Sequence, residues 1–305
     1  MATAIKQKAP ARPRRGGMEA ISWSAWIWIA PAVVLELIFF IYPVLNTIQL
    51  SFLDNNSVNY VGFRNYVRIF TDPNLLEVLR NNVLWLVLAT VLTVGIGLVV
   101  AVLVDRIKIE SVVKSALFVP MAISMVGASV IWRFVYLYNP PGQTQAGVLN
   151  AILAVFNIPP QVWLINPAVN NFAIIAVYVW MWSGFCMTIL SAALKGVPDE
   201  ILEAARIDGA GRFTLFWRIM IPMISSTIAV VTTTMIIGIL KIFDIVYVMT
   251  GGNYHTDVVA LEFYNQLFNF NNYGQASALA VLLMIVIVPV MYINIRRIRR
   301  EEAQR

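Results

Sequence analysis

The residues of this 305-residue chain that could do chemistry are charged side chains inside long apolar stretches. Arg133, Lys241 and Asp244 occupy such positions, and Glu36 lies near the middle of the first stretch. Because a charge is costly in an apolar environment, these residues are candidates for contact with a polar ligand. The alternative for the first three is a structural ion pair or cluster. For Glu36 it is a hydrogen bond to the backbone or to a Ser or Thr hydroxyl.

The spacing of these charges predicts that they lie close together. Lys241 and Asp244 are three positions apart, which makes them neighbours on one face of a continuous helix. At a rise of about 1.5 Å per residue, Arg133 falls at nearly the same depth in its own apolar stretch. We expect the three residues to lie at one depth, in the outer third of the membrane.

Three aromatic residues share a second face. Tyr178, Trp182 and Phe185 recur at helical spacing within one apolar stretch. Aromatic rings pack well against the C–H surface of a sugar ring, and the polar atoms of Tyr and Trp can bond its hydroxyl groups. The alternative is packing or anchoring at a membrane interface.

The sequence argues against several other chemistries. One cysteine, Cys186, and one histidine, His255, cannot form an intrachain disulfide or a Cys/His metal cluster, so we expect no metal site. A membrane-embedded enzyme would need a nucleophile beside a general base. One cysteine, one histidine and widely spaced acidic residues in the apolar stretches argue against such a pair. The net charge of +6 resides at the ends of apolar runs rather than on one patch, so we expect no nucleic-acid partner.

The elements that hold these residues are predicted to be membrane-spanning helices. The chain is 59% hydrophobic and 12% charged, with a mean hydropathy of +0.75. Since each span needs about 20 apolar residues and must satisfy its backbone internally, the sequence predicts an all-α membrane protein surrounded by lipid. The six predicted spans are 24–50, 82–104, 115–138, 172–194, 223–249 and 276–295.

Lys and Arg residues predict the orientation of these spans. They are concentrated in residues 1–23, in residues 296–305 and in the second and fourth connections, whereas the third and fifth connections have none. Because positive charge favours the cytoplasmic side, we expect both termini to be cytoplasmic tails flanking a membrane domain over residues 24–295. Within the third connection, residues 148–156 form an apolar segment too short to span, which predicts a short interfacial helix.

The fourth connection contains a polar stretch, EILEAARIDGAGRFTLFWRIMIPMI. Pro198, at the first helical position, and the acidic residues that follow it predict a helix start. Gly209 and Gly211 predict a left-handed stop. A helix this short is below the about 12 to 15 residues that hold themselves in water, so its order must come from docking. We expect its apolar side to consist of Ile201, Leu202, Ala205 and Ile207.

This stretch resembles the EAA signature of permease subunits of binding-protein-dependent ABC importers. The matching positions are Glu203, Ala204, Ala205, Asp208, Gly209, Ala210, Ile219 and Pro222. The segments FIYPVLNTIQLSF, GFRNY, FDIVYVMTGG and NNYGQASALAVLL are similar to the carbohydrate-uptake branch, the maltose and glycerol-3-phosphate type. The resemblance covers roughly residues 25–300 and implies the type I ABC importer permease fold, in the plasma membrane.

The resemblance implies a carbohydrate importer in which residues 196–222 form the coupling loop to an ATPase. Glu203, Ala204, Ala205, Asp208 and Gly209 would contact that ATPase dimer. The other implied partners are a second homologous permease and an extracytoplasmic solute-binding protein. No phosphate-binding G-x-x-x-x-G-K-[ST] loop occurs in the chain, so ATP and Mg are expected on the partner, and the chain is not expected to be an enzyme.

Two rival hypotheses stay open at this point. An ion-gradient-driven secondary transporter would use Glu36 and Asp244 as ion sites, but it leaves the polar helix unexplained. A structural scaffold gives no account of charges at matched depth. Within the importer hypothesis, we expect Tyr178, Trp182, Phe185, Lys241 and Asp244 to line the substrate path.

Overall fold

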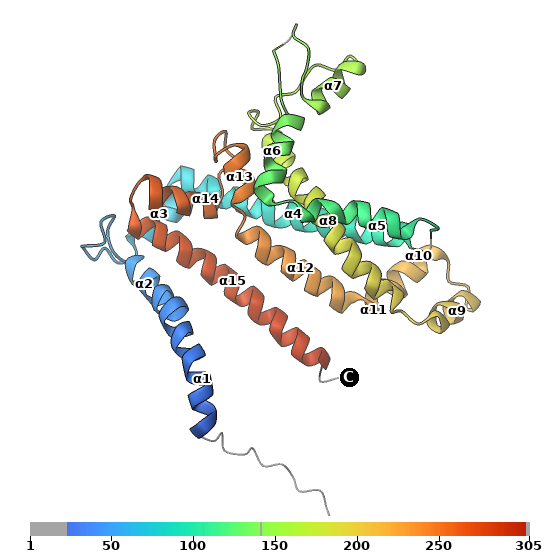
Figure 1. Ribbon diagram of the computed structural model, residues 1–305, viewed down its shortest axis with the longest axis horizontal. Helices are drawn as coiled ribbons and strands as arrows, with labels where there is room; N and C mark the ends of the chain where they lie inside the picture. The colour runs from blue at the N-terminus through green and yellow to red at the C-terminus, as the bar shows by residue number, and fades with distance from the viewer. Residues whose placement is uncertain (1–22, 106, 141, 303–305) are drawn as a thin grey trace, which may run out of the picture. The chain divides into compact units, whose positions relative to one another are not determined.

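The computed structural model describes residues 23–105, 107–140 and 142–302, and these residues form helices joined by loops (Figure 1). One isolated bridge joins Leu53 to Tyr60, and these ranges contain no strand. The predicted N-terminal tail, residues 1–23, lies outside the described residues except for Trp23. Of the predicted C-terminal tail, 296–305, the helical backbone is described as far as Glu302.

The helices before the long loop that follows α6 are α1 (Trp23–Glu36), the π turn η1 (Leu37–Ile41), α2 (Tyr42–Leu50), α3 (Arg64–Thr71), α4 (Pro73–Val104), α5 (Glu110–Phe118), the 3-10 turn η2 (Val119–Ala122) and α6 (Met125–Val135). The later ones are α7 (Val148–Val155), α8 (Asn170–Lys195), α9 (Asp199–Ile207), α10 (Arg212–Leu215), the π turn η3 (Phe216–Met220), α11 (Ile221–Met223), α12 (Ser225–Leu240), α13 (Asp244–Met249), α14 (Val259–Tyr264), the π turn η4 (Asn265–Asn269) and α15 (Tyr273–Glu302). The short interfacial helix predicted over 148–156 corresponds to α7.

The chain divides into two compact units, Met1–Asn46 and Thr47–Arg305. In the first unit, described side chains from Ile27 onward are exposed throughout. The π turn η1 explains how this helix accommodates Pro43. In a regular α-helix the proline ring would clash with the carbonyl group four residues earlier, and the wider turn relieves that clash. Likewise, the residue four positions before Pro222 lies in the π turn η3, and the wider turn relieves the equivalent clash.

Four helices of the described chain are long and apolar enough to cross a membrane, namely Ile27–Leu50, Pro73–Val104, Asn170–Lys195 and Tyr273–Arg296. Two helix pairs pass the same test together but are bent, Glu110–Ala122 with Met125–Val135 by 102° and Arg212–Met223 with Ser225–Leu240 by 69°. The predicted number of six spans is reached if each bent pair counts as one. The bend of span three lies beside Pro120, an interior proline of the kind that is expected to kink a helix, and the bend of the fifth pair falls between Met223 and Ser225.

Local chemistry accounts for the bend in the third span. Pro120 lies in the 3-10 turn η2, where it cannot continue an α-helical hydrogen-bond ladder. Ser124 then takes an extended conformation, and its hydroxyl oxygen accepts a hydrogen bond from the Gly127 N–H at 3.0 Å. This N-cap starts α6 as a new helix with its own direction.

Helices α4 and α8 form the centre of the second unit, where they run side by side in the same direction (Figure 1). Their approach is so close that a Cβ atom at Gly97 would lie 2.6 Å from Cβ of Cys186. The end at which α4 and α8 begin also holds α3 and is named the α3 end. The end at which they finish holds α9 and is named the α9 end.

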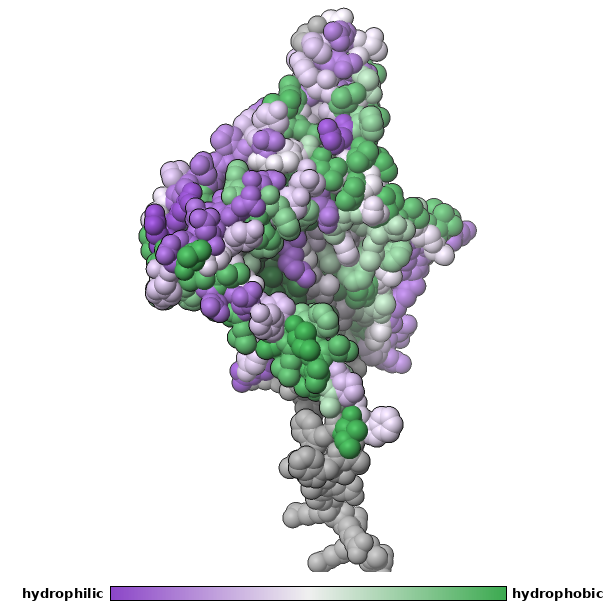
Figure 2. All heavy atoms as spheres, turned by 60° about the vertical axis from the view of Figure 1, so that its left-hand side comes forward, coloured by the Kyte–Doolittle hydropathy of each residue, from purple (hydrophilic) through white to green (hydrophobic). Residues whose placement is uncertain are grey.

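Much of the visible surface carries hydrophobic side chains, while hydrophilic ones are densest at the left of the view and also lie at its top and right edge (Figure 2). Val87 and Val91 on α4, and Ile285 and Val288 on α15, are examples of exposed apolar residues in the middle of long helices. Exposed apolar surface on this scale is unfavourable in water and favourable against lipid tails. The surface therefore fits the membrane environment predicted from composition.

Candidate functional site

The polar connection between α8 and α12 contains α9 and the turn that closes it. Pro198 lies one position before the helix and not at its first position as predicted. Asp199 and Glu200 occupy the first turn, where carboxylates favour the positive end of the helix dipole. The predicted helix therefore forms, with its start shifted by one residue.

The end of α9 is a Schellman motif. The Ala210 N–H donates to the Ala205 carbonyl oxygen at 2.9 Å, and the Gly209 N–H donates to the Arg206 carbonyl oxygen at 3.1 Å. Gly209 has a φ of +85°, so its predicted left-handed conformation is confirmed. The same prediction for Gly211 is wrong, since its φ is −68°. The chain has already turned at Gly209, and Gly211 serves as the extended N-cap of α10.

The helix divides its apolar residues between two opposite faces. Leu202 is buried, and Ala205 and Ala210 pack against the main core, so these three residues tie α9 to the bundle. Ile207 is 86% exposed. The prediction that Ile207 shares the apolar side of Leu202 is therefore wrong, because five residues of α-helix turn Ile207 roughly 140° away from Leu202.

The outward face of α9 is formed by Glu203, Ala204 and Ile207, with Asp208 and Gly209 at its end, and is named the α9 surface. Four of the five predicted coupling residues lie on it, whereas Ala205 faces the core. Two aromatic side chains of the same connection are also exposed. Phe213 and Trp217 are 78% and 53% exposed, with their ring centroids 6.2 Å apart.

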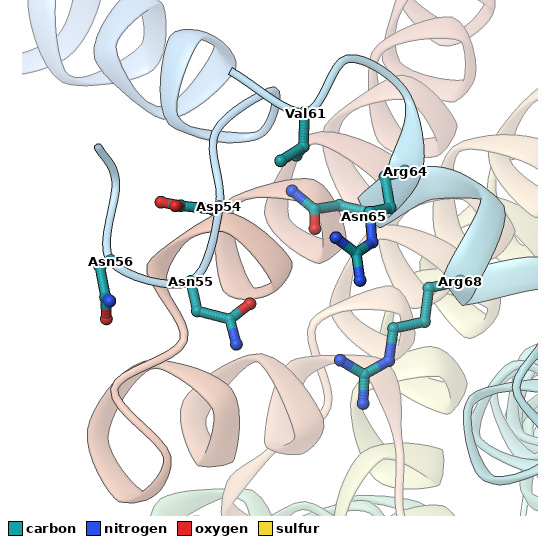
Figure 3. A pocket seen from close by; sticks show the side chains of 7 residues that line it. All are labelled: Asp54, Asn55, Asn56, Val61, Arg64, Asn65 and Arg68. Carbon is teal, nitrogen blue, oxygen red and sulfur yellow. The ribbon is translucent and has the colours of Figure 1, made fainter. Parts of the chain in front are cut away.

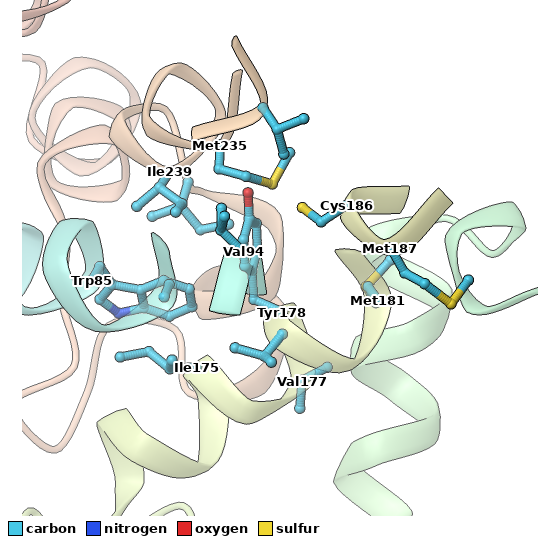
Figure 4. Packing of buried hydrophobic residues seen from close by; sticks show 14 of the residues in the cluster. Trp85, Val94, Ile175, Val177, Tyr178, Met181, Cys186, Met187, Met235 and Ile239 are labelled. Atoms are coloured by element: carbon cyan, nitrogen blue, oxygen red, sulfur yellow. The ribbon is translucent and has the colours of Figure 1, made fainter. Parts of the chain in front are cut away.

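The structure brings the three predicted aromatic residues together as a ladder. The ring centroids of Tyr178 and Trp182 are 6.1 Å apart and stacked, and those of Trp182 and Phe185 are 5.9 Å apart in an edge contact. Tyr178 is 1% exposed and lies among Trp85, Val94 and other core side chains (Figure 4). Trp182 is half-buried, and its buried Nε1 has no hydrogen-bond partner among the described residues.

The predicted pairing of Lys241 with Asp244 on one helix face is wrong. Helix α12 ends at Leu240, where tight i to i−3 bonds at Lys241 and Ile242 close it. Asp244 then begins the separate helix α13. Within the described chain no ion pair joins Arg133, Lys241 and Asp244 to one another. Arg133 instead donates from Nη1 to the Val248 carbonyl oxygen at 3.3 Å.

Glu36 is the last residue of α1 in the first unit, and its side chain is exposed. None of the hydrogen bonds found in the described part of the chain involves this carboxylate. The predicted bond to a Ser or Thr hydroxyl or to the backbone is therefore not found within the described chain.

Comparison with known proteins decides the family. Residues 93–300 match the model of the binding-protein-dependent transport system inner membrane component family. The chain belongs to this family. As a permease of this kind it is a multi-pass inner-membrane protein and a transport component.

Two relatives cover nearly the whole permease. It is 53% identical over 279 residues to the osmoprotective compounds uptake permease protein GgtC of Synechocystis sp., covering 92% of this chain and 100% of that protein. It is 42% identical over 277 residues to the alpha-glucoside transport system permease protein AglF of Rhizobium meliloti, covering 90% of this chain and 82% of that protein.

The permease also resembles a solved structure, a bacterial alginate ABC transporter in complex with an alginate pentasaccharide-bound periplasmic protein. The TM-score is 0.77 at 22% identity, and the match covers 91% of this chain and 94% of the other. This likeness confirms the predicted ABC importer permease fold.

A cluster of asparagines that the sequence analysis missed stabilises the α3 end. Asn81 donates to the carbonyl oxygens of His255 and Asp257, both at 2.9 Å. Asn170 donates to the Tyr254 carbonyl oxygen at 2.7 Å and Asn171 to that of His255 at 3.0 Å, while the side-chain oxygen of Asn82 accepts from the Val259 N–H at the start of α14 at 2.7 Å. The signal in the sequence is an Asn-Asn pair near the start of each of two apolar stretches.

This loop of the permease also contains a perturbed carboxyl group. Burial, followed by the charge of the nearby Glu262, raises the pKa of Asp257 to about 8. In the same loop, His255 Nδ1 lies 2.7 Å from Oε1 of Glu77. The folded protein therefore favours protonated Asp257 at pH values where the unfolded chain has already lost that proton.

This shift predicts how the stability of the permease depends on pH. Because the folded pKa of Asp257 lies above the unfolded value of 3.8, its protonated form stabilises the fold at low pH. That contribution is lost as pH rises from about 4 to about 8. We expect the Tm of the detergent-purified permease to fall across this window, and Asp257→Asn to flatten the fall. An unchanged pH profile in Asp257→Asn would show that another group is responsible.

Proposed function

We propose that this permease is the membrane subunit of an ABC importer that carries a small glycoside or oligosaccharide across the plasma membrane. The α9 surface docks on a separate ATPase dimer, which binds ATP and Mg. A second homologous permease completes the path, and an extracytoplasmic solute-binding protein delivers the substrate. Both termini and the α9 end face the cytoplasm.

The two-faced character of α9 carries this proposal. Leu202 and Ala205 fix the inward face to the bundle, so movement of the helix must move the bundle with it. Ile207 on the outward face is 86% exposed and has no role in internal packing. A large apolar side chain exposed on a short helix between spans gains stability when a partner covers it. The Schellman motif at Gly209 fixes the end of α9, so that the inward and outward faces keep their orientation.

Rigid attachment gives a mechanism for coupling. When the ATPase dimer closes, it moves α9 as a lever, and the bundle changes between conformations that open toward one side or the other. A flexible connection would absorb this movement. The short closed turn and the buried Leu202 therefore suit a coupling element better than a passive loop.

The substrate class rests on the relatives and on the aromatic ladder. The names of GgtC and AglF refer to osmoprotective compounds and to alpha-glucosides, respectively. An uncharged glycoside is compatible with stacking on Trp182, whose unpartnered Nε1 could donate to a sugar hydroxyl group. In this proposal Tyr178 supports Trp182 from within the core, Phe185 extends the aromatic face, and Lys241 and Asp244 lie farther along the path.

Replacing Trp182 tests the sugar contact. We expect Trp182→Ala to raise the sugar concentration for half-maximal uptake by roughly three- to tenfold, since it removes one stacking surface and one donor. The matched control is Trp180→Ala on the same helix. Trp180 packs edge-on against Trp132, at a centroid distance of 5.5 Å, so that variant should change abundance more than affinity. Equal affinity in wild type and Trp182→Ala would assign Trp182 to packing.

A reconstituted system tests the function as a whole. Proteoliposomes containing the permease, the second permease, the ATPase and the binding protein should hydrolyse ATP faster when a transported disaccharide or glycoside is added. Sugar uptake should persist when a protonophore collapses the ion gradient while ATP is maintained. Uptake that stops under those conditions would support an ion-gradient-driven transporter and contradict the proposal.

A further inference from the structure

A polar pocket of about 410 Å³ opens at the α3 end, and its lining residues include none from α9 or the aromatic ladder. It lies between α3 and the loop that precedes it. Its lining residues are Asp54, Asn55, Asn56, Val61, Arg64, Asn65 and Arg68. The arginines extend from α3 toward the side of the pocket that Asn55 forms (Figure 3).

The charged side chains that can contact a ligand in this pocket are positive. Arg64 and Arg68 are four residues apart on α3 and both are exposed. Arg64 has no ion pair with any described residue, and Nε of Arg68 is 3.7 Å from a carboxylate oxygen of Asp72. Asp54 is already engaged. Its carboxylate accepts from the Val58 N–H and from Asn59 Nδ2, which lowers its pKa.

Two guanidinium groups beside amide side chains select an oxyanion. Guanidinium N–H groups match the oxygen atoms of phosphate and carboxylate groups in pairs, with stronger bonds than neutral donors make. Asn65 is fixed on one wall, where its Nδ2 donates to the carbonyl oxygens of Ser51 and Leu53 at 2.9 and 2.8 Å. The amide groups of Asn55 and Asn56 line the opposite side and can add donors.

The packing of α3 places this pocket at the edge of the membrane. Ile69 on α3 belongs to the same buried cluster as Ala278 and Leu279 of α15. Leu279 is six residues from the start of the spanning helix at Tyr273, which is about 9 Å along its axis. The height of α3 is therefore that of the first turns of a span, where lipid headgroups lie.

A second face of α3 is apolar and exposed. Phe63, Val67 and Phe70 are 68%, 58% and 55% exposed, and Tyr60 on the preceding loop is 75% exposed. On an amphipathic helix at this depth, such a face inserts among the lipid chains while its polar neighbours remain at the headgroups. The faces are adjacent, so a lipid lying against Val67 would place its headgroup near the arginines.

We propose that Arg64 and Arg68 bind the phosphodiester of an anionic phospholipid such as phosphatidylglycerol, with its acyl chains along the apolar face of α3. The distribution of Lys and Arg in the sequence supports this proposal independently. These two arginines and Arg80 are the Lys and Arg residues of a connection on the side of the membrane where the other connections have none. A specific ligand accounts for two of these three exceptions to the usual charge distribution, Arg64 and Arg68.

Native mass spectrometry tests this site on the full chain with its bound subunits. Complexes are extracted from vesicles of equal parts phosphatidylglycerol and phosphatidylcholine. We expect wild type to retain phosphatidylglycerol, and Arg64→Gln to retain roughly tenfold less, because a charge-assisted contact is lost. The control Arg80→Gln removes the same charge from α4 outside the pocket, and it should match wild type.

Two results would overturn the proposal. Arg64→Gln could retain as much phosphatidylglycerol as wild type, and weaker docking of the binding protein in that variant would then assign the pocket to that partner. Alternatively, inorganic phosphate could displace the lipid and thereby identify a free-anion site. If Arg64→Gln fails to accumulate, Asn56→Asp provides a second test. It places a carboxylate at the exposed rim without altering α3, and it should reduce retention to a similar extent.

Discussion

A Gly209→Val permease is expected to insert in the membrane at normal abundance and to lose uptake by at least roughly tenfold. Gly209 has a φ of +85°, and a β-branched residue there costs about 1 to 3 kcal/mol. The Schellman bonds that connect Ala210 to Ala205 and Gly209 to Arg206 would open, and α9 would lose its fixed orientation. The measurement is labelled-sugar uptake divided by the amount of permease in the membrane.

Gly211→Val is the matched control for this prediction. Gly211 has a φ of −68° and ψ of 165°, and a Cβ atom there would have no neighbour within 4 Å. Valine adopts this extended conformation without strain, so the control should keep most of its uptake. Equal loss in both variants, or normal uptake in Gly209→Val, would count against a rigid coupling turn.

Ile207→Asp is expected to separate the permease from its ATPase. The side chain is 86% exposed in the isolated chain, so the substitution should leave folding unaffected. Within a docked interface it would bury an unpaired charge, which weakens association by at least about tenfold. The measurement is the amount of ATPase that co-purifies with a tagged permease.

Ile152→Asp on α7 is the control for this second prediction. Ile152 is also exposed, at 49%, but it lies on a helix outside the α9 connection. This variant should retain the ATPase. Normal retention by Ile207→Asp would mean that the α9 surface is not where the ATPase docks.

The sequence allowed local features of the coupling connection to be predicted. The left-handed turn at Gly209 depends on one residue type and its place after a short helix, so it could be recognised from the sequence. The outward position of Ile207 could not, because hydrophobicity does not distinguish a residue packed in its own chain from one that awaits a partner. Family resemblance identified the residues of the motif but not the inward role of Ala205.

For the spans, the positions of the helices could be predicted from the sequence, whereas their exact bends and breaks could not. Apolar stretches located the helices because burial in lipid depends on composition over a window of about 20 residues. An interior proline such as Pro120 indicates that the third span is interrupted, but the 102° angle also depends on the Ser124 cap, which composition over a window does not reveal. The break after Leu240 likewise separates Lys241 from Asp244, although hydrophobicity continues through it.

Long-range contacts were the least predictable part of the structure. The asparagine cluster joins Asn81 to a loop more than 170 residues away, and nothing local to either segment reveals that pairing. Tyr178 was predicted as a path residue from its spacing with Trp182. Its burial against Trp85 depends on which helix lies beside α8, which spacing alone does not specify.

Thiol protection at position 207 tests the central claim most directly. The native Cys186 is fully buried, so Ile207→Cys provides an accessible thiol on α9 without further engineering. The thiol should react rapidly with a maleimide in the permease alone and should be protected when the ATPase is bound. Equal reactivity in both states, in a complex that still transports sugar, would contradict the account.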